Sequence, residues 1–208
     1  MITLAIDTST PRGGVVLLAD STLLFEEHFT ADRSHSSSLF TALEKARALT
    51  AHIDQIAIGL GPGSYAGVRI AIAAAIGLRF SLGAKLVGIP SVAALDTPAP
   101  AYIVIGDARR ESFYFSHVED GLCVAGPLLA TEPELAKRLE TCAHLPLLAT
   151  VAVPQFPAAQ IVLPSALRLA HLAAAGRGIV ATDTLEPIYL REPHITQPKQ
   201  RPGIPPRP

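Results

Sequence analysis

The chain has 208 residues, of which 49% are hydrophobic and 17% charged, and its formal net charge is −1. A chain of this size and apolarity can bury a large core, which excludes disorder over most of its length, and its balanced charge excludes a global attraction to nucleic acid. Two cysteines, Cys123 and Cys142, form neither a disulfide framework nor a paired-cysteine metal motif, and they indicate a reducing, cytoplasmic compartment. An acid at Asp7 and the lack of a basic stretch before it argue against a signal peptide.

Three apolar runs near the N-terminus, separated by Gly13-Gly14 and Asp20-Ser21, predict an antiparallel meander of strands. An amphipathic helix with serine N-caps follows, and then a buried strand, a glycine-rich loop and a second helix. In chain order, these elements are expected at residues 2–6, 15–19, 22–29, 34–51, 56–60 and 65–82.

The second half repeats this order of elements without repeating the residues. Its strands and helices are expected at residues 101–105, 112–118, 122–124, 132–141, 145–153 and 165–175. The repeat predicts an N-terminal lobe over 1–98 and a C-terminal lobe over 99–192. Six prolines in residues 193–208 exclude a regular element there, so we expect a solvated tail, with a docking peptide as the alternative.

The glycine-rich loop offers backbone amides at the start of a helix, which attract anions. Gly61, Gly63 and Ser64 are its candidate phosphate-binding residues. The loop has no lysine for a P-loop, no acid follows where a Rossmann site needs one, and Pro62 and Ala66 replace the glycines of a nucleophile elbow. Phosphate binding and a plain tight turn therefore both stay open.

Aspartates end the first strand of each half, at Asp7 and Asp107. Together with Thr8, they would suit nucleotide phosphates and a divalent ion in a cleft between the halves. Either acid could instead cap a turn. The seven histidines show no spacing that places two of them on one helix face, so metal catalysis is not expected. His35 stands between two serines, which is not triad geometry, and it is interpreted as a helix-start residue.

The helix expected at 65–82 is apolar on nearly every side, and only Arg69 and Arg79 interrupt it. Such a helix must be covered on all sides. Its longest apolar run, 70–78, is too short for a membrane span, which needs about 20 residues. Neighbouring helices of the same chain can cover part of it, and the remainder favours a partner protein, with Ile76 and Phe80 as the candidate anchors.

Six segments appear in order: LAIDTST, SHSSSLF, IAIGLGPGSYAGVRIAIAAAIGL, GIPSVAAL, DARRESFY and LEPIYLR. Together they resemble the TsaB (YeaZ) family of glycoprotease-like proteins over residues 1–192. The match departs mildly at residues 65–69, where typical members read Phe-Thr-Gly-Leu-Arg. The resemblance implies an α/β fold of two duplicated RNase H-like lobes, as in the actin/Hsp70-like (ASKHA) superfamily, with a C-terminal lobe shorter than usual.

The resemblance also implies a role. The paralogue TsaD carries a two-histidine metal motif, and Ser91 and Leu95 stand at those positions here, so the chain resembles the non-catalytic partner. Such a subunit pairs with TsaD, helps to recruit the ATPase TsaE, and serves the complex that installs threonylcarbamoyl on the tRNA adenosine next to the anticodon. Alone it would form a homodimer.

The expected interface comprises Leu39, Phe40, Leu43, Arg69, Ile72, Ala73, Ile76 and Phe80. No catalytic residue, metal or cofactor of its own is expected, although ATP or ADP at the complex interface stays open. A weak nucleotide site would use Asp7, Thr8, Gly61, Gly63, Ser64 and Asp107. The alternative function is a stand-alone ATP-dependent phosphotransferase of the actin-like superfamily, which the two aspartates keep open.

Overall fold

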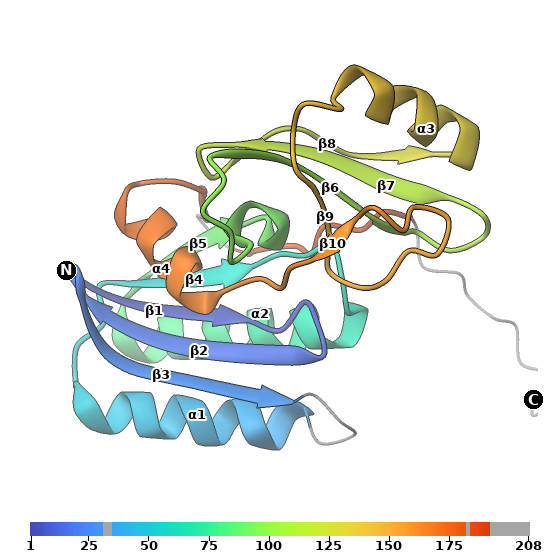
Figure 1. Ribbon diagram of the computed structural model, residues 1–208. Coiled ribbons are helices and arrows are strands. Elements are labelled where there is room, and N and C mark those ends of the chain that lie inside the picture. The colour runs from blue at the N-terminus through green and yellow to red at the C-terminus, as the bar shows by residue number, and fades with distance from the viewer. Residues whose placement is uncertain (31–34, 182–183, 192–208) are drawn as a thin grey trace, which may run out of the picture.

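Two β-sheets with helices packed on them make up the computed structural model, which describes residues 1–30, 35–181 and 184–191 (Figure 1). The expected tail over 193–208 and the capping role of Ser34 lie outside the described residues. The elements in chain order are β1 (Ile2–Asp7), β2 (Arg12–Ala19), β3 (Thr22–Thr30), α1 (His35–Leu49), β4 (Gln55–Gly59), α2 (Tyr65–Leu82), β5 (Lys85–Ile89), η1 (Ser91–Ala94), β6 (Ala101–Asp107), β7 (Phe113–Glu119), β8 (Leu122–Ala130), α3 (Glu132–Thr141), β9 (Leu147–Ala149), β10 (Gln160–Ile161), α4 (Ala166–Ala174) and β11 (Ile179–Ala181).

The two sheets repeat one topology. In the first sheet, β1, β2 and β3 form the predicted antiparallel meander, and β4 and β5 follow as parallel strands beside β1. In the second sheet, β6, β7 and β8 form a second meander, and β9 and β10 continue it in parallel. The strand orders are β11-β5-β4-β1-β2-β3 and β10-β9-β6-β7-β8. This confirms the duplicated α/β fold.

Three apolar cores lie between the layers of sheets and helices. Helices α1 and α2 cover one face of the first sheet, and α3 covers the outer face of the second (Figure 1). Helix α4 and the short η1 lie between the two sheets and fill the core there. Helix α4 contacts β1, β2 and β4, and β11 extends the first sheet. Elements late in the chain therefore complete the first layer, and the boundary near residue 98 stays a prediction.

Two strands of the second sheet differ from the sequence prediction. Strand β8 runs on to Ala130 through Gly126-Pro127, although this dipeptide is typical of a turn. It can do so because β8 is an edge strand, where the missing proline N–H leaves no ladder bond unmade. Strand β9 covers only Leu147–Ala149 of the expected 145–153, since the chain turns away after it.

Helix α2 has the predicted bounds and is capped at both ends. The Ser64 hydroxyl accepts a hydrogen bond from the Gly67 N–H, and Gly83 ends the helix in the left-handed conformation. Its inner side packs on β4 and β5. Its outer side, which includes Ala73, Gly77 and Phe80, is exposed, so the expected complete burial is not achieved within this chain.

Helix α2 is also the one described helix that is long and apolar enough to cross a membrane, with 18 residues and a mean hydropathy of 1.4. Its inner residues Val68, Ala71 and Ile72 belong to the core beneath the first sheet. One side of the helix is therefore packed into the core, while its outer side is exposed.

Candidate functional site

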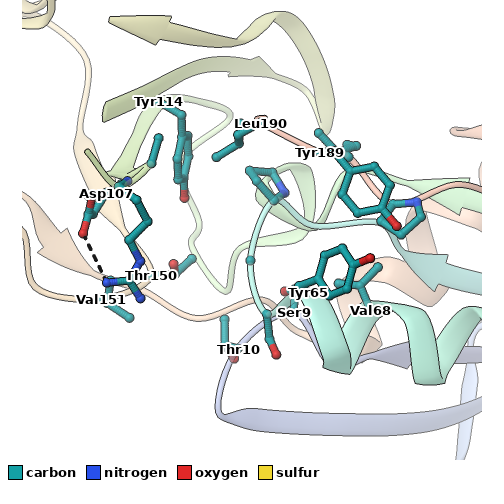
Figure 2. Close-up of a pocket in the computed structure, with 18 of the residues that line it drawn as sticks. Ser9, Thr10, Tyr65, Val68, Asp107, Tyr114, Thr150, Val151, Tyr189 and Leu190 are labelled. Atoms are coloured by element: carbon teal, nitrogen blue, oxygen red, sulfur yellow. Dashed lines mark hydrogen bonds and ion pairs between the residues drawn. The ribbon is translucent and has the colours of Figure 1, made fainter. Parts of the chain in front are cut away.

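A cavity of about 480 Å³ lies between the two sheets, where β1, β4, β6 and β9 end (Figure 2). Open α/β sheets bind ligands outside the carboxyl ends of their parallel strands. Both lobes contribute such ends here, so the duplication itself creates the cavity. The predicted residues Gly63, Ser64 and Asp107 line it.

The glycine-rich loop forms the wall on the side of the first lobe. The Ser64 N–H donates a hydrogen bond of 2.7 Å to the Ser9 carbonyl, which ties the start of α2 to the end of β1. A Cβ atom on Gly63 would lie 2.1 Å from that same carbonyl oxygen. The glycine is therefore required for the close approach of two backbones, whether or not an anion binds.

Three of the predicted phosphate-site residues lie behind this wall instead of in the cavity. Asp7 is only 2% exposed, and its Oδ1 accepts hydrogen bonds from the N–H (2.9 Å) and the hydroxyl (2.7 Å) of Ser9. The Thr8 hydroxyl donates to the Gly67 carbonyl, and the Gly61 N–H donates to the Ser91 hydroxyl. Asp7, Thr8 and Gly61 therefore do not line the cavity, and Asp7 Oδ2 has no hydrogen-bond partner among the described residues. Their part in phosphate binding stays a prediction.

Burial raises the pKa of Asp7 above its ordinary value of 3.8, and the hydrogen bonds from Ser91 and Ser9 only oppose this shift. The folded state therefore binds a proton more tightly than the unfolded chain. The contribution of the Asp7 carboxyl to the free energy of unfolding is therefore complete below about pH 3.8, and it is lost as the pH rises through the pKa of the folded state.

Asp7→Asn should therefore gain stability over the natural chain as the pH rises. Asparagine keeps an acceptor for Ser9 and cannot ionise. Urea unfolding at pH 4 and pH 8 checks this, with the free-energy difference between variant and natural chain growing at the higher pH. Two parallel stability profiles would show that the carboxyl does not carry the pH dependence.

The wall on the side of the second lobe is a strained, basic loop. Asp107 Oδ1 accepts a hydrogen bond of 2.6 Å from the Arg109 N–H, and the Arg109 guanidinium lies 3.8 Å from Asp107 Oδ2. Arg109, Arg110 and Glu111 have positive φ values of 66°, 53° and 56°. Each left-handed residue other than glycine costs energy, and such strain is concentrated at functional sites.

The segment over 184–191 crosses the cavity and joins both lobes. Its Ile188 N–H donates to the Leu60 carbonyl at the end of the first sheet, and Arg191 donates to the Ser112 hydroxyl in the second lobe, at 2.6 Å. Its Tyr189 ring lies 5.4 Å from the Tyr65 ring at the start of α2. We call this segment the strap.

Sequence reasoning missed Tyr114, Tyr189 and Arg191 as cavity residues. Two of the segments that carry the family resemblance, DARRESFY and LEPIYLR, contain them. Their proximity was not predictable, because it depends on the strap returning to the second lobe.

The predicted interface residues differ in their burial. Leu39, Leu43 and Ile72 are buried in the core under the first sheet, which corrects their assignment to a surface. Ile76 is half-buried against the same core. The remaining four are exposed: Phe40, Arg69, Ala73 and Phe80. Among these, Phe40 is 49% and Phe80 82% exposed.

The model of the family "TsaD: tRNA N6-adenosine threonylcarbamoyltransferase" matches residues 30–152. A protein of Haemophilus influenzae named tRNA threonylcarbamoyladenosine biosynthesis protein TsaB is 32% identical over 127 residues, which are 55% of this chain and 52% of that protein. The chain belongs to this family, on its TsaB/YeaZ branch.

Two further proteins match over most of the length. An uncharacterised protein of Mycobacterium tuberculosis is 30% identical over 200 residues, which are 91% of this chain and 92% of that protein. A crystal structure from Pseudomonas aeruginosa, described as similar to peptidase YeaZ, superposes with a TM-score of 0.70 at 26% identity. It covers 91% of this chain and 99% of that structure.

In this TsaB/YeaZ-family chain, Ser91 and Leu95 occupy the positions where the resemblance places the two histidines of TsaD. The Ser91 hydroxyl holds the glycine-rich loop through the Gly61 N–H, and Leu95 is buried in the core between the sheets. Within residues 1–30, 35–181 and 184–191, no three His, Cys, Asp or Glu side chains cluster as metal ligands would.

Proposed function

We propose that this chain is a non-catalytic subunit of the complex that installs threonylcarbamoyl on the tRNA adenosine next to the anticodon. As a TsaB/YeaZ-family member, it is a subunit that functions in tRNA threonylcarbamoyladenosine biosynthesis. In this proposal it works in the cytoplasm, pairs with TsaD, helps to recruit TsaE and reaches tRNA only through the complex. The exposed outer side of α2 carries the proposal.

That side is suited to another helix. Ala73 and Gly77 are small enough to let a partner backbone approach closely, and Phe80 protrudes beside them into solvent. On α1, Phe40 adds a second exposed ring. Large exposed apolar groups at the centre of a surface are typical anchors of an interface. In the absence of TsaD, we propose that the same side joins two copies of the chain.

The absence of catalysis is supported by what the corresponding residues do. Ser91 and Leu95 are both buried and are engaged in loop and core contacts. Neither side chain is a good metal ligand, and leucine is none at all. We therefore propose that the chemistry belongs to TsaD.

The purified chain should show no threonylcarbamoyl transfer and no peptidase activity when metal, ATP and substrate are supplied and TsaD is left out. Modified adenosine measured by mass spectrometry of the tRNA checks the first, and cleavage of labelled casein checks the second. Adding TsaD and TsaE should restore transfer and serves as the positive control. Turnover by the chain alone would refute the non-catalytic role.

The alternative function, an ATP-dependent phosphotransferase, has one feature in its favour: Asp107 is half-exposed and lines the cavity. The described cavity lining has arginines but no lysine to hold a triphosphate. We propose that the chain has no cofactor of its own and that ATP or ADP binds at the complex interface. Calorimetric titration with ATP and Mg²⁺ should find no tight site in the isolated chain. A dissociation constant of about 1 μM or lower would favour the phosphotransferase.

A further inference from the structure

We propose that the cavity between the two sheets binds a small phosphate monoester that carries an aromatic ring. The site belongs to the isolated chain and does not depend on the partner proteins of the proposed function. Tyr114 and the arginines of the second lobe would hold the phosphate, and Tyr65 and Tyr189 at the other end would contact the ring.

The strongest observation is the Tyr114 hydroxyl. The side chain is 4% exposed, and no described group makes a well-aligned hydrogen bond with its hydroxyl, although the Thr150 side chain lies close enough to lower its pKa. Figure 2 shows this hydroxyl directed into the space between the lining side chains. Its ring fits there because Gly106 has no Cβ, which would lie 2.3 Å from the ring. A buried hydroxyl without a partner is costly, and a bound oxyanion would supply the missing acceptor.

The protonation of Tyr114 suits this role. Burial raises the pKa of Tyr114 to about 12, although the Thr150 side chain acts in the opposite direction. The hydroxyl is therefore protonated at neutral pH and can only gain from an acceptor. Hydrogen bonds from such a donor to an anion are stronger than bonds between neutral groups.

The charge around the hydroxyl favours an anion. The described lining contains a single carboxylate, Asp107, and three arginines, at 109, 110 and 191. The Arg191 Nε atom is buried and has no partner, while its terminal nitrogen binds Ser112. Arginines are common phosphate-binding groups.

The opposite end of the cavity is aromatic. The Tyr65 and Tyr189 rings pack together at 5.4 Å and both remain partly exposed. Arg69 fixes the pair from outside, because its guanidinium lies 5.2 Å from the Tyr65 ring centre and donates to the Tyr65 hydroxyl. Figure 2 shows these two rings and the basic loop at opposite ends of the cavity. A volume of about 480 Å³ is that of a small-molecule site.

The test is a titration followed by ³¹P and ¹H NMR, with phenyl phosphate, inorganic phosphate, phenol and AMP as probes. Phenyl phosphate should bind the isolated chain saturably, with a dissociation constant on the order of 1 mM. Phosphate and phenol should each bind at least about tenfold more weakly, as expected when one half of the contacts is missing. The ratio of AMP to phenyl phosphate affinity then separates a nucleotide from a smaller aryl phosphate.

Tyr114→Phe should weaken phenyl phosphate binding about tenfold, because it removes one hydrogen bond to a charged group. Its melting temperature without ligand should be unchanged or higher, since it removes an unpaired buried hydroxyl. Tyr102→Phe is the matched control, because this equally buried hydroxyl donates to the Val92 carbonyl and does not line the cavity. It should lower the melting temperature and leave phenyl phosphate affinity unchanged.

Three results would overturn the proposal. One is the absence of saturable binding by any phosphate probe. Another is equal affinity for phenyl phosphate and inorganic phosphate. The third is a Tyr114→Phe variant that is destabilised but binds phenyl phosphate normally, since the hydroxyl would then have only a structural role.

Discussion

Phe80→Asp should abolish stable pairing with TsaD while the chain remains folded. Phe80 is 82% exposed, so its side chain contributes little to the chain's own core. An aromatic anchor at the centre of an interface typically contributes about 2 kcal/mol or more, so its loss should weaken binding by about thirtyfold or more. Co-elution with TsaD on a sizing column and a calorimetric titration measure the effect, and circular dichroism checks folding.

Val124→Asp is the matched control for this experiment. Val124 is an exposed apolar residue too, at 51%, but it lies on β8 at the edge of the second sheet, away from α2. This variant should pair normally. Ile76 is less suitable than Phe80, because it is half-buried against the core and a charge there would also disturb folding. A soluble Phe80→Asp chain that pairs normally with TsaD would remove the outer side of α2 from the interface.

Gly59→Ala should be among the most destabilising single substitutions in the chain. A Cβ atom at this position would lie 1.8 Å from Asp7 Oδ2 and 2.6 Å from the Ser91 hydroxyl. Neither group can move freely, because Asp7 is hydrogen-bonded to Ser9 and the Ser91 hydroxyl is hydrogen-bonded to the Gly61 N–H. Overpacking of this kind costs about 3 kcal/mol, and urea unfolding measures the loss.

Gly77→Ala is the contrasting substitution, and it should raise the free energy of unfolding. No atom lies within 4 Å of a Cβ at this position in the middle of α2. Alanine should therefore stabilise the helix by about 0.5–1 kcal/mol. If Gly59→Ala lost less than about 1 kcal/mol, the Asp7 carboxyl would have to be more mobile than its hydrogen bonds indicate.

Local patterns predicted the elements well where each element is defined by its own residues. The meander, α2 and α3 have the expected positions, because strand turns and helix caps are local features. The sequence could not show which side of a helix meets which layer. Leu39 and Phe40 are neighbours in α1, yet one is buried and the other half exposed.

The site was less predictable than the fold. An aspartate after a strand has the same local sequence whether it faces a cavity or lies behind its wall. Asp7 is sequestered by the Ser9 and Ser91 hydroxyls, whereas Asp107 remains at the cavity. That difference depends on the approach of η1 to the first sheet, which involves residues more than 80 positions apart.

The strap has a consequence for the order in which the molecule assembles. Residues 1–89 contain every strand of the first sheet except β11, and the outer edge of β5 has no partner until residues 179–181 reach it. The strap over 184–191 joins the two lobes later still. During synthesis the first lobe therefore emerges with the edge of β5 uncovered, which is a hazard for association with other chains. The cavity forms only when almost all of the chain has left the ribosome, so a product that ends after β11 but before the strap would retain both sheets and have no closed cavity.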